Sequence, residues 1–146
     1  PLRIRQHNEN AIKVAEFLRG HPRIGNVIFP AYQEGENKRR AETYFRPGSY
    51  GALVGFELRD GREAGRSFIN GLKLLYHVAN IGDARSLAIH PSTTTHSQLS
   101  PEEQLATGVT PGYVRLSIGI EHPDDIIRDL QQALDQVAGD RELKAA

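Results

Sequence analysis

Apolar positions in this chain recur at two spacings, which together predict a domain that mixes helices and strands. Near the N-terminus they fall at i, i+3, i+4 and i+7, one face of a helix, at Ala11, Val14, Ala15 and Leu18. Gly20 and the following His21-Pro22 end this helix, because glycine accepts the conformation beyond a helix and proline cannot continue one. Helical spacing returns twice, at Ala64, Phe68, Leu72 and Leu75, and at Ile127, Leu130, Leu134 and Val137 before Gly139.

Four short apolar runs bounded by turn residues predict strands, at residues 25–30, 51–58, 76–81 and 113–120. The last run alternates strictly, so Val114, Leu116, Ile118 and Ile120 share one face of the strand. Arg115, Ser117 and Gly119 share the other face. Residues 33–46 are polar and charged, and predict a surface helix. One sheet whose apolar face lies under amphipathic helices accommodates all these elements, so we expect a two-layer α/β domain.

Two helix starts match the capping-box pattern, Asp60 with Glu63 and Ser100 with Glu103. Residues 83–99 lie between them, show no periodicity and include the hydroxyl run Ser92 to Thr95. Long irregular connections in compact domains are often functional. These hydroxyls either bind a polar ligand or satisfy the backbone of the segment itself.

Length and composition narrow the class of protein. The 146 residues fit one domain, and 18 Lys+Arg balance 18 Asp+Glu, so no net field attracts nucleic acid or an anionic membrane. With no cysteine, disulfides and thiolate chemistry are excluded, and a cytoplasmic location is expected. No apolar run approaches the roughly 20 residues that span a bilayer. Methionine is absent even at position 1, so we expect a processed chain or a piece of a longer protein.

The candidate chemistry is sparse. His90 and His96 lack the further ligands that zinc needs, and two loop histidines in hydrogen bonds are favoured over a metal site. Neither a nucleophile elbow nor a glycine-rich phosphate loop occurs. Arg115 stands out because its small neighbours Ser117 and Gly119 leave room beside it. It either binds a carboxylate through its planar fork or lies on the wet face of a half-exposed sheet.

Two motifs point to a known family. The loop His90-Pro-Ser-Thr-Thr-Thr-His96 and the strand Arg115-Leu-Ser-Ile-Gly-Ile-Glu121 resemble those of the Cys/Met-metabolism pyridoxal-phosphate (PLP) enzymes. The resemblance runs from the opening helix to Leu134. It implies the small C-terminal domain of a fold-type I enzyme, a mostly antiparallel sheet of four to five strands with helices packed on one side. Residues 1–20 would be an interdomain helix, and residues 21–146 a C-terminal substrate-binding domain. The N-terminal PLP-binding domain, with its Schiff-base lysine, would lie upstream, so this chain alone is expected to be inactive.

Within the family, Asn80-Ile-Gly-Asp83 is similar to the O-acetylhomoserine sulfhydrylase branch. That branch implies a transferase of methionine biosynthesis, in which sulfide replaces the acetate of O-acetyl-L-homoserine to give homocysteine. Cystathionine γ-synthase, methionine γ-lyase and, from another class, a stand-alone non-catalytic binding domain are the alternatives. The resemblance assigns the substrate α-carboxylate to Arg115 and supporting roles to Asn80 and Thr95. Asn80 stands where related lyases and synthases carry a serine that helps hold the substrate carboxylate and the catalytic lysine. Its side chain departs from that pattern, which leaves a backbone contact as the alternative. The expected partners are the amino-acid substrate, the N-terminal domain and a homotetramer, with no nucleic acid, membrane or metal.

Overall fold

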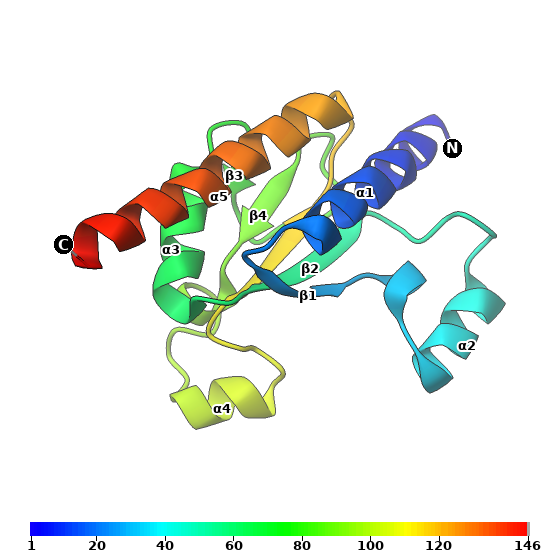
Figure 1. Cartoon of the computed structure of the whole chain (residues 1–146). Coiled ribbons are helices and arrows are strands. Elements are labelled where there is room, and N and C mark those ends of the chain that lie inside the picture. The colour runs from blue at the N-terminus through cyan, green and yellow to red at the C-terminus, as the bar shows by residue number, and fades with distance from the viewer. Residues whose placement is uncertain (146) are drawn as a thin grey trace.

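The computed structural model describes the backbone of residues 1–145 and the side chains through Val137. Along the chain the elements are α1 (Leu2–Gly20), β1 (Ile24–Ile28), the short 3-10 helix η1 (Pro30–Tyr32), α2 (Gly35–Tyr44), β2 (Leu53–Leu58), α3 (Gly61–Gly71), β3 (Tyr76–His77), β4 (Leu87–Ile89), the 3-10 helix η2 (Pro91–Thr93), α4 (Pro101–Ala106), β5 (Tyr113–Ser117) and α5 (Pro123–Ala145) (Figure 1). In the described part of the chain, no helix is long and apolar enough to cross a membrane.

The five strands form one sheet in the order β1-β2-β5-β4-β3. Every neighbouring pair is antiparallel except β3 with β4, which is parallel. The strictly alternating run therefore becomes the central strand, β5. The two-layer fold with a mostly antiparallel sheet is confirmed, and its mixed edge is a detail added by the structure.

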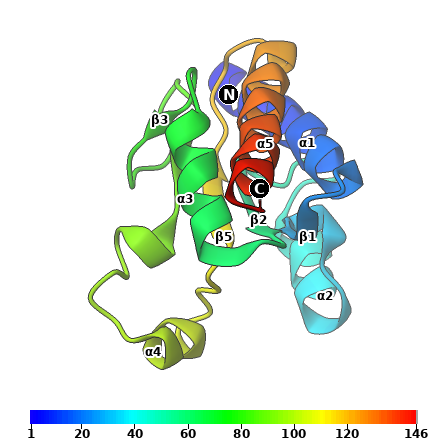
Figure 2. The same cartoon turned by 60° about the vertical axis from the view of Figure 1, so that its left-hand side comes forward.

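Three helices cover one face of the sheet, with α5 between α1 and α3 (Figure 2). Alternate side chains of β2 and β5 point into this layer and are fully buried. Phe56 of β2 meets Phe68 of α3 edge-on, with ring centroids 5.4 Å apart. The α1 stripe predicted from the sequence is buried in the same core, with Ala11, Val14, Ala15 and Leu18 all at 0% exposure.

Polar side chains fix the connections between these layers. The Asp129 carboxylate of α5 accepts the backbone N–H groups of Lys73, Leu74 and Leu75, at 2.8 to 3.2 Å. It thereby holds the turn from α3 into β3. On α1, the amide of Asn10 donates to the carbonyls of Gly119 and Glu121. These bonds anchor the helix to the chain that leaves β5.

Several boundaries differ from those predicted. The third predicted strand, 76–81, contains only the two residues of β3, and its apolar Val78 and Ile81 are exposed. The segment 83–99, predicted to be irregular, contains β4, which is fully buried. Three residues are too short to show periodicity, and β4 exists because β3 and β5 pair with its two edges. Because β5 ends at Ser117, Ile120 is 39% exposed rather than on the apolar face.

Two helix details also need correction. Asp60 precedes α3 but makes no side-chain cap, since its φ and ψ of −87° and 11° lie outside the extended geometry typical of that position. Its carboxylate instead pairs with Arg23 at 3.1 Å. In α5 the helix continues through Gly139, and the buried stripe includes Ile126 where Ile127 was expected. The capping box at Ser100 and Glu103 is confirmed in both hydrogen bonds.

Candidate substrate-binding site

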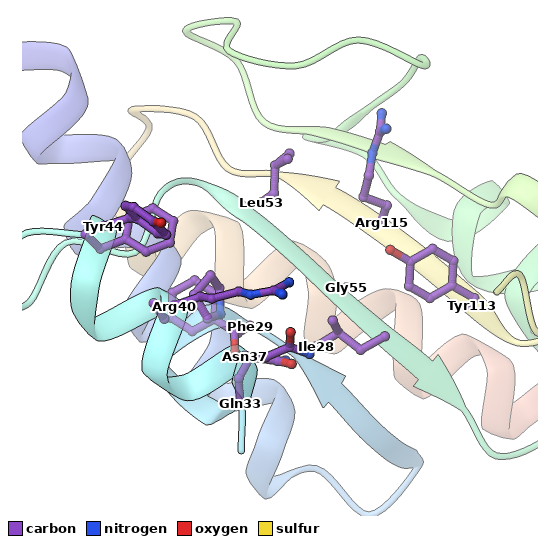
Figure 3. Close-up of a pocket in the computed structure, with 13 residues that line it drawn as sticks. Ile28, Phe29, Gln33, Asn37, Arg40, Tyr44, Leu53, Gly55, Tyr113 and Arg115 are labelled. Atoms are coloured by element: carbon purple, nitrogen blue, oxygen red, sulfur yellow. The ribbon is translucent and has the colours of Figure 1, made fainter. Parts of the chain in front are cut away.

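The sheet face opposite α1, α3 and α5 carries a cavity of about 410 Å³, closed at one side by α2. Arg115 and Tyr113 of β5 lie on this face, and Arg40 projects from α2 toward the strands (Figure 3). The same strand places Val114 and Leu116 in the core, because successive side chains of a strand point to opposite faces. The alternation read from the sequence thus puts Arg115 on the open face.

Gly55 creates the space in which Tyr113 lies. Gly55 of β2 pairs with Arg115 across the sheet. A Cβ atom at Gly55 would come within 2.8 Å of the Tyr113 ring and 3.3 Å of Ile28 Cβ. Any side chain there would displace the tyrosine, so the absence of one lets the ring lie across β2. Burial raises the pKa of the Tyr113 phenol, with Arg115 acting in the opposite direction and Glu57 adding to the rise. The hydroxyl group therefore stays protonated.

The Arg115 guanidinium points away from α2, and its Nη2 donates to the carbonyl oxygen of Asn80 at 3.3 Å (Figure 3). Its buried Nε has no hydrogen-bond partner. Among the described residues, no carboxylate forms an ion pair with this arginine. A guanidinium that has no carboxylate partner among the described residues, on the open face of the sheet, is suited to an incoming carboxylate.

Residues 78–82 form a short segment beside Arg115, and two further bonds fix Gly82. The Gly82 N–H donates to Ser117 Oγ at 3.1 Å, and Arg3 donates to the Gly82 carbonyl at 3.0 Å. Asn80 is exposed, and its side-chain oxygen accepts the N–H of Ile81. The structure therefore brings Asn80 to Arg115 through its backbone and not through its side chain.

Thr95 is not brought to Arg115 by any contact in the described chain. It is exposed, and its hydroxyl lies 2.9 Å from His96 Nδ1. Thr94 instead satisfies its own segment, since its hydroxyl donates to the carbonyl of His90. The Thr93 hydroxyl lies 2.9 Å from the ring Nδ1 of His90 and 3.3 Å from the same carbonyl. Both threonines therefore bond within the loop that contains them.

His90 is fully buried and both ring nitrogens have partners. Nε2 lies 2.8 Å from the carbonyl oxygen of Pro111, which can only accept, so this nitrogen carries the proton. Nδ1 lies 2.9 Å from Thr93 Oγ1. Burial lowers the pKa of His90, so the ring is neutral. The expectation that both loop histidines make hydrogen bonds is confirmed. No group of metal-binding side chains occurs among the described residues.

Glu121, at the end of the strand motif, has a structural role that its position in the sequence did not show. Its carboxylate accepts the backbone N–H of Ser86 at 2.7 Å and the Ser86 hydroxyl at 2.9 Å. The Ser86 oxygen in turn accepts the N–H of Gly119 at 2.8 Å. A Cβ at Gly119 would lie 2.4 Å from both the Ala84 carbonyl and the Glu121 carboxylate. The serine, glycine and glutamate therefore lock the start of β4 against the end of β5, beside the segment that faces Arg115.

Among the described residues, those that line the Arg115 cavity do not form a complete catalytic centre. No lysine lines the Arg115 cavity, so the described residues do not provide the Schiff-base lysine of a PLP site. Lys13, Lys38 and Lys73 are exposed, and the Lys144 side chain lies outside the described residues.

Comparison with known proteins gives the family. The model of the Cys/Met metabolism PLP-dependent enzymes matches residues 1–135, and the chain belongs to this family. The chain is 52% identical over 137 residues to an O-acetyl-L-homoserine sulfhydrylase of Leptospira meyeri, covering 94% of this chain and 31% of that protein. It is 40% identical over 136 residues to an L-methionine γ-lyase of Fusobacterium nucleatum, covering 93% and 34%. The chain thus spans about a third of the length of these curated relatives.

A solved structure supports the same assignment. A Campylobacter jejuni protein assigned as an O-acetylhomoserine (thiol)-lyase superimposes with a TM-score of 0.83 and 42% identity, over 92% of this chain and 32% of that one. That protein carries a pyridoxyl-lysine phosphate. The resemblance read from the two motifs is therefore confirmed at the level of the family and the fold.

Proposed function

We propose that this chain is the C-terminal domain of a PLP-dependent transferase that makes homocysteine and acetate from O-acetyl-L-homoserine and sulfide. Its contribution is the site for the substrate α-carboxylate. The observation that carries the proposal is Arg115, a guanidinium next to a cavity with a buried, unpartnered Nε and no carboxylate pair in the described chain. The bidentate fork of arginine fits a carboxylate in geometry and charge.

The described residues bind and orient, and PLP supplies the electron sink when the full-length protein holds it. Arg115 fixes the amino-acid end of the substrate. Asn80 holds the arginine through its carbonyl oxygen, which accepts from Nη2. Thr95 is assigned a supporting role by the family motif alone. The 146 residues by themselves are inactive in this proposal, because their cavity offers no Schiff-base lysine.

The central experiment measures kcat and KM of the full-length protein with Arg115→Ala and Arg115→Lys. Loss of a desolvated charge-assisted pair costs about 2–5 kcal/mol, so kcat/KM for O-acetyl-L-homoserine falls roughly 30-fold to several thousand-fold, with a raised KM. Arg115→Lys keeps the positive charge but loses the planar fork, so it regains only part of the kcat/KM that Arg115→Ala loses. Arg128→Ala is the matched control, because this arginine lies on the exposed side of α5, paired with Asp125. An unchanged KM in Arg115→Ala contradicts the carboxylate assignment.

The supporting residues are separated by a second pair of variants. Asn80→Ala keeps the backbone carbonyl, so KM changes less than threefold if the backbone is the part that serves. Thr95→Val removes a hydroxyl that bonds only to His96 in the described chain. A raised KM in Thr95→Val, without a change in melting temperature, supports a role at the substrate or cofactor. An unchanged KM removes Thr95 from the site.

Methionine γ-lyase is the second candidate function, because relatives with that name reach 40% identity. Turnover of L-methionine without sulfide distinguishes it from the sulfhydrylase. Assays with cysteine in place of sulfide as the nucleophile test cystathionine γ-synthase.

A natural start codon immediately before Pro1 favours a stand-alone binding domain. A long upstream reading frame with the family lysine removes that alternative. We also propose a full-length homotetramer in the cytoplasm, which light scattering and cell fractionation test.

A further inference from the structure

A second cavity, of about 360 Å³, lies between α3, β3 and η2 and shares no lining residue with the Arg115 cavity. Its lining residues come from three places in the chain, Arg62, Arg66, Ile69 and Asn70 of α3, His77 of β3, and Thr93 and Thr94 of the η2 turn. No carboxylate is among them. The polar groups that remain available are two guanidiniums, an amide and an imidazole.

Both arginines of this cavity lack a protein partner in the described part of the chain. Other arginines are engaged: Arg23, Arg39, Arg40 and Arg128 in ion pairs, and Arg3, Arg59 and Arg115 with backbone carbonyls. Arg62 and Arg66 are one helical turn apart, so both project from the same side of α3. Two free guanidiniums in one hollow form a concentrated positive charge.

The charge of Arg62 contributes to the pKa shift of His90, a buried residue next to the η2 turn. Burial is the main cause of the lowered pKa of His90, and the charges of Arg62 and His77 lower it further. Glu63 acts in the opposite direction but does not line the cavity. The hydrogen bond to Pro111 also acts to raise this pKa, so the effect of Arg62 is one contribution among several.

The turn that carries Thr93 and Thr94 is fixed against α3 by the buried His90. The His90 ring packs on Gly65 of α3 so closely that a Cβ there would lie 2.4 Å from Nε2. The same ring bonds to Pro111 and to Thr93, and Thr94 bonds back to the His90 carbonyl. Ile69 is 6% exposed and forms an apolar wall. The donors therefore stand on a fixed base rather than on a loose loop, and binding does not have to order that base.

We propose that this cavity binds a small molecule carrying a phosphate or sulfate group, with Arg62 and Arg66 as its main ligands. Arginine forks match tetrahedral oxyanions bidentately, and the amide of Asn70 adds a neutral donor. The site adjoins both segments discussed for the substrate: His77 directly precedes residues 78–82, and Thr94 directly precedes Thr95. The proposal stands on this cavity alone and does not depend on the reaction assigned to the enzyme.

Inorganic phosphate and sulfate are the probes, titrated by calorimetry into the full-length holoprotein at constant ionic strength set with chloride. Wild type is expected to bind saturably, and Arg62→Gln/Arg66→Gln to lose at least about tenfold in affinity. Arg46→Gln is the matched control, because this arginine is also exposed but lies outside the cavity. Its affinity stays at the wild-type level.

Arginine modification supplies a readout that does not rely on the variants folding. Phenylglyoxal labelling followed by peptide mass spectrometry should show Arg62 and Arg66 protected by phosphate or sulfate, and Arg46 not protected. Absence of saturable binding in the wild type, equal binding by the double variant, or equal protection at Arg46 each overturns the proposal. A phosphate monoester that binds more tightly than inorganic phosphate, through the same two arginines, identifies an ester as the ligand; a weaker one identifies the free oxyanion.

Discussion

The two faces of the sheet have different tasks, although a single strand contributes to both. On the helix-covered face, Val114 and Leu116 of β5 are fully buried among apolar side chains. On the other face, Tyr113 and Arg115 of the same strand line a cavity, and Arg115 is held by one backbone carbonyl. The covered face stabilises the fold by excluding water, and the open face keeps polar groups available. Alternation along five residues is enough to put the core on one face and the cavity on the other.

The largest expected effect tests the covered face. Leu116→Ala removes a fully buried side chain from the central strand, and is expected to destabilise the protein by about 2–5 kcal/mol. Thermal unfolding of the full-length protein measures the change. Enzyme that remains folded keeps a near-normal KM for the amino-acid substrate, because the site residues are on the other face. If Leu116→Ala raised KM without lowering the melting temperature, the covered face would also contribute to substrate binding, which would contradict this assignment of the two faces.

A smaller effect is expected on the open face. Ser117→Ala leaves the Gly82 N–H without its partner and costs about 0.5–1.5 kcal/mol. That bond fixes residues 78–82, and the Asn80 carbonyl in this segment accepts from Arg115. KM for the amino-acid substrate should therefore rise even at temperatures where the variant is fully folded. Ser49→Ala is the control, since its side chain makes no hydrogen bond to any of the described residues. Equal KM values for the two variants would show that residues 78–82 do not position Arg115.

The smallest effect is a pH dependence at a polar group on the covered side. Burial lowers the pKa of His90 below its ordinary value of 6.5, so the unfolded chain binds a proton more readily than the folded one. The stability that neutral His90 contributes is complete above pH 6.5 and is lost as pH falls through and below that value. Melting temperatures measured across this range should decline toward acid.

His90→Gln is expected to flatten that decline. His21, whose pKa is also lowered by burial, serves as the comparison, because it is more exposed than His90. His21→Gln should flatten the decline less. If melting temperature declined toward acid pH as steeply in His90→Gln as in the wild type, His90 would not be the cause of the decline.

Local patterns predicted the elements that are long or capped. The α1 stripe, the β5 alternation and the Ser100 capping box all depend on neighbours a few residues away, and all three are confirmed. The same rules failed at Asp60, where Arg23, thirty-seven positions distant, takes the carboxylate that was expected to cap α3. They failed again at β4, whose three residues form a strand only because two other strands flank them.

The candidate site was only partly predictable for the same reason. Arg115 was identified from its strand and from a family motif, and the structure places it beside a cavity. Its hydrogen bond to the Asn80 carbonyl was not predicted, because it depends on where residues 78–82 lie beside β5. Tyr113 was not singled out, because its position depends on Gly55 in a strand nearly sixty residues earlier. The glycine was the one available signal, and its meaning appears only when β2 lies beside β5.

The sequence by itself determined the family, the two-layer fold and the face of β5 on which Arg115 lies. These follow from side-chain periodicity and from two motifs, which are properties of neighbouring residues. Only the tertiary structure decided which groups meet: Gly82 with Ser117, Glu121 with Ser86, and Arg62 and Arg66 with the turn that follows His90. Such encounters depend on strand order and helix packing, because burial and hydrogen bonding are satisfied between segments distant in the chain.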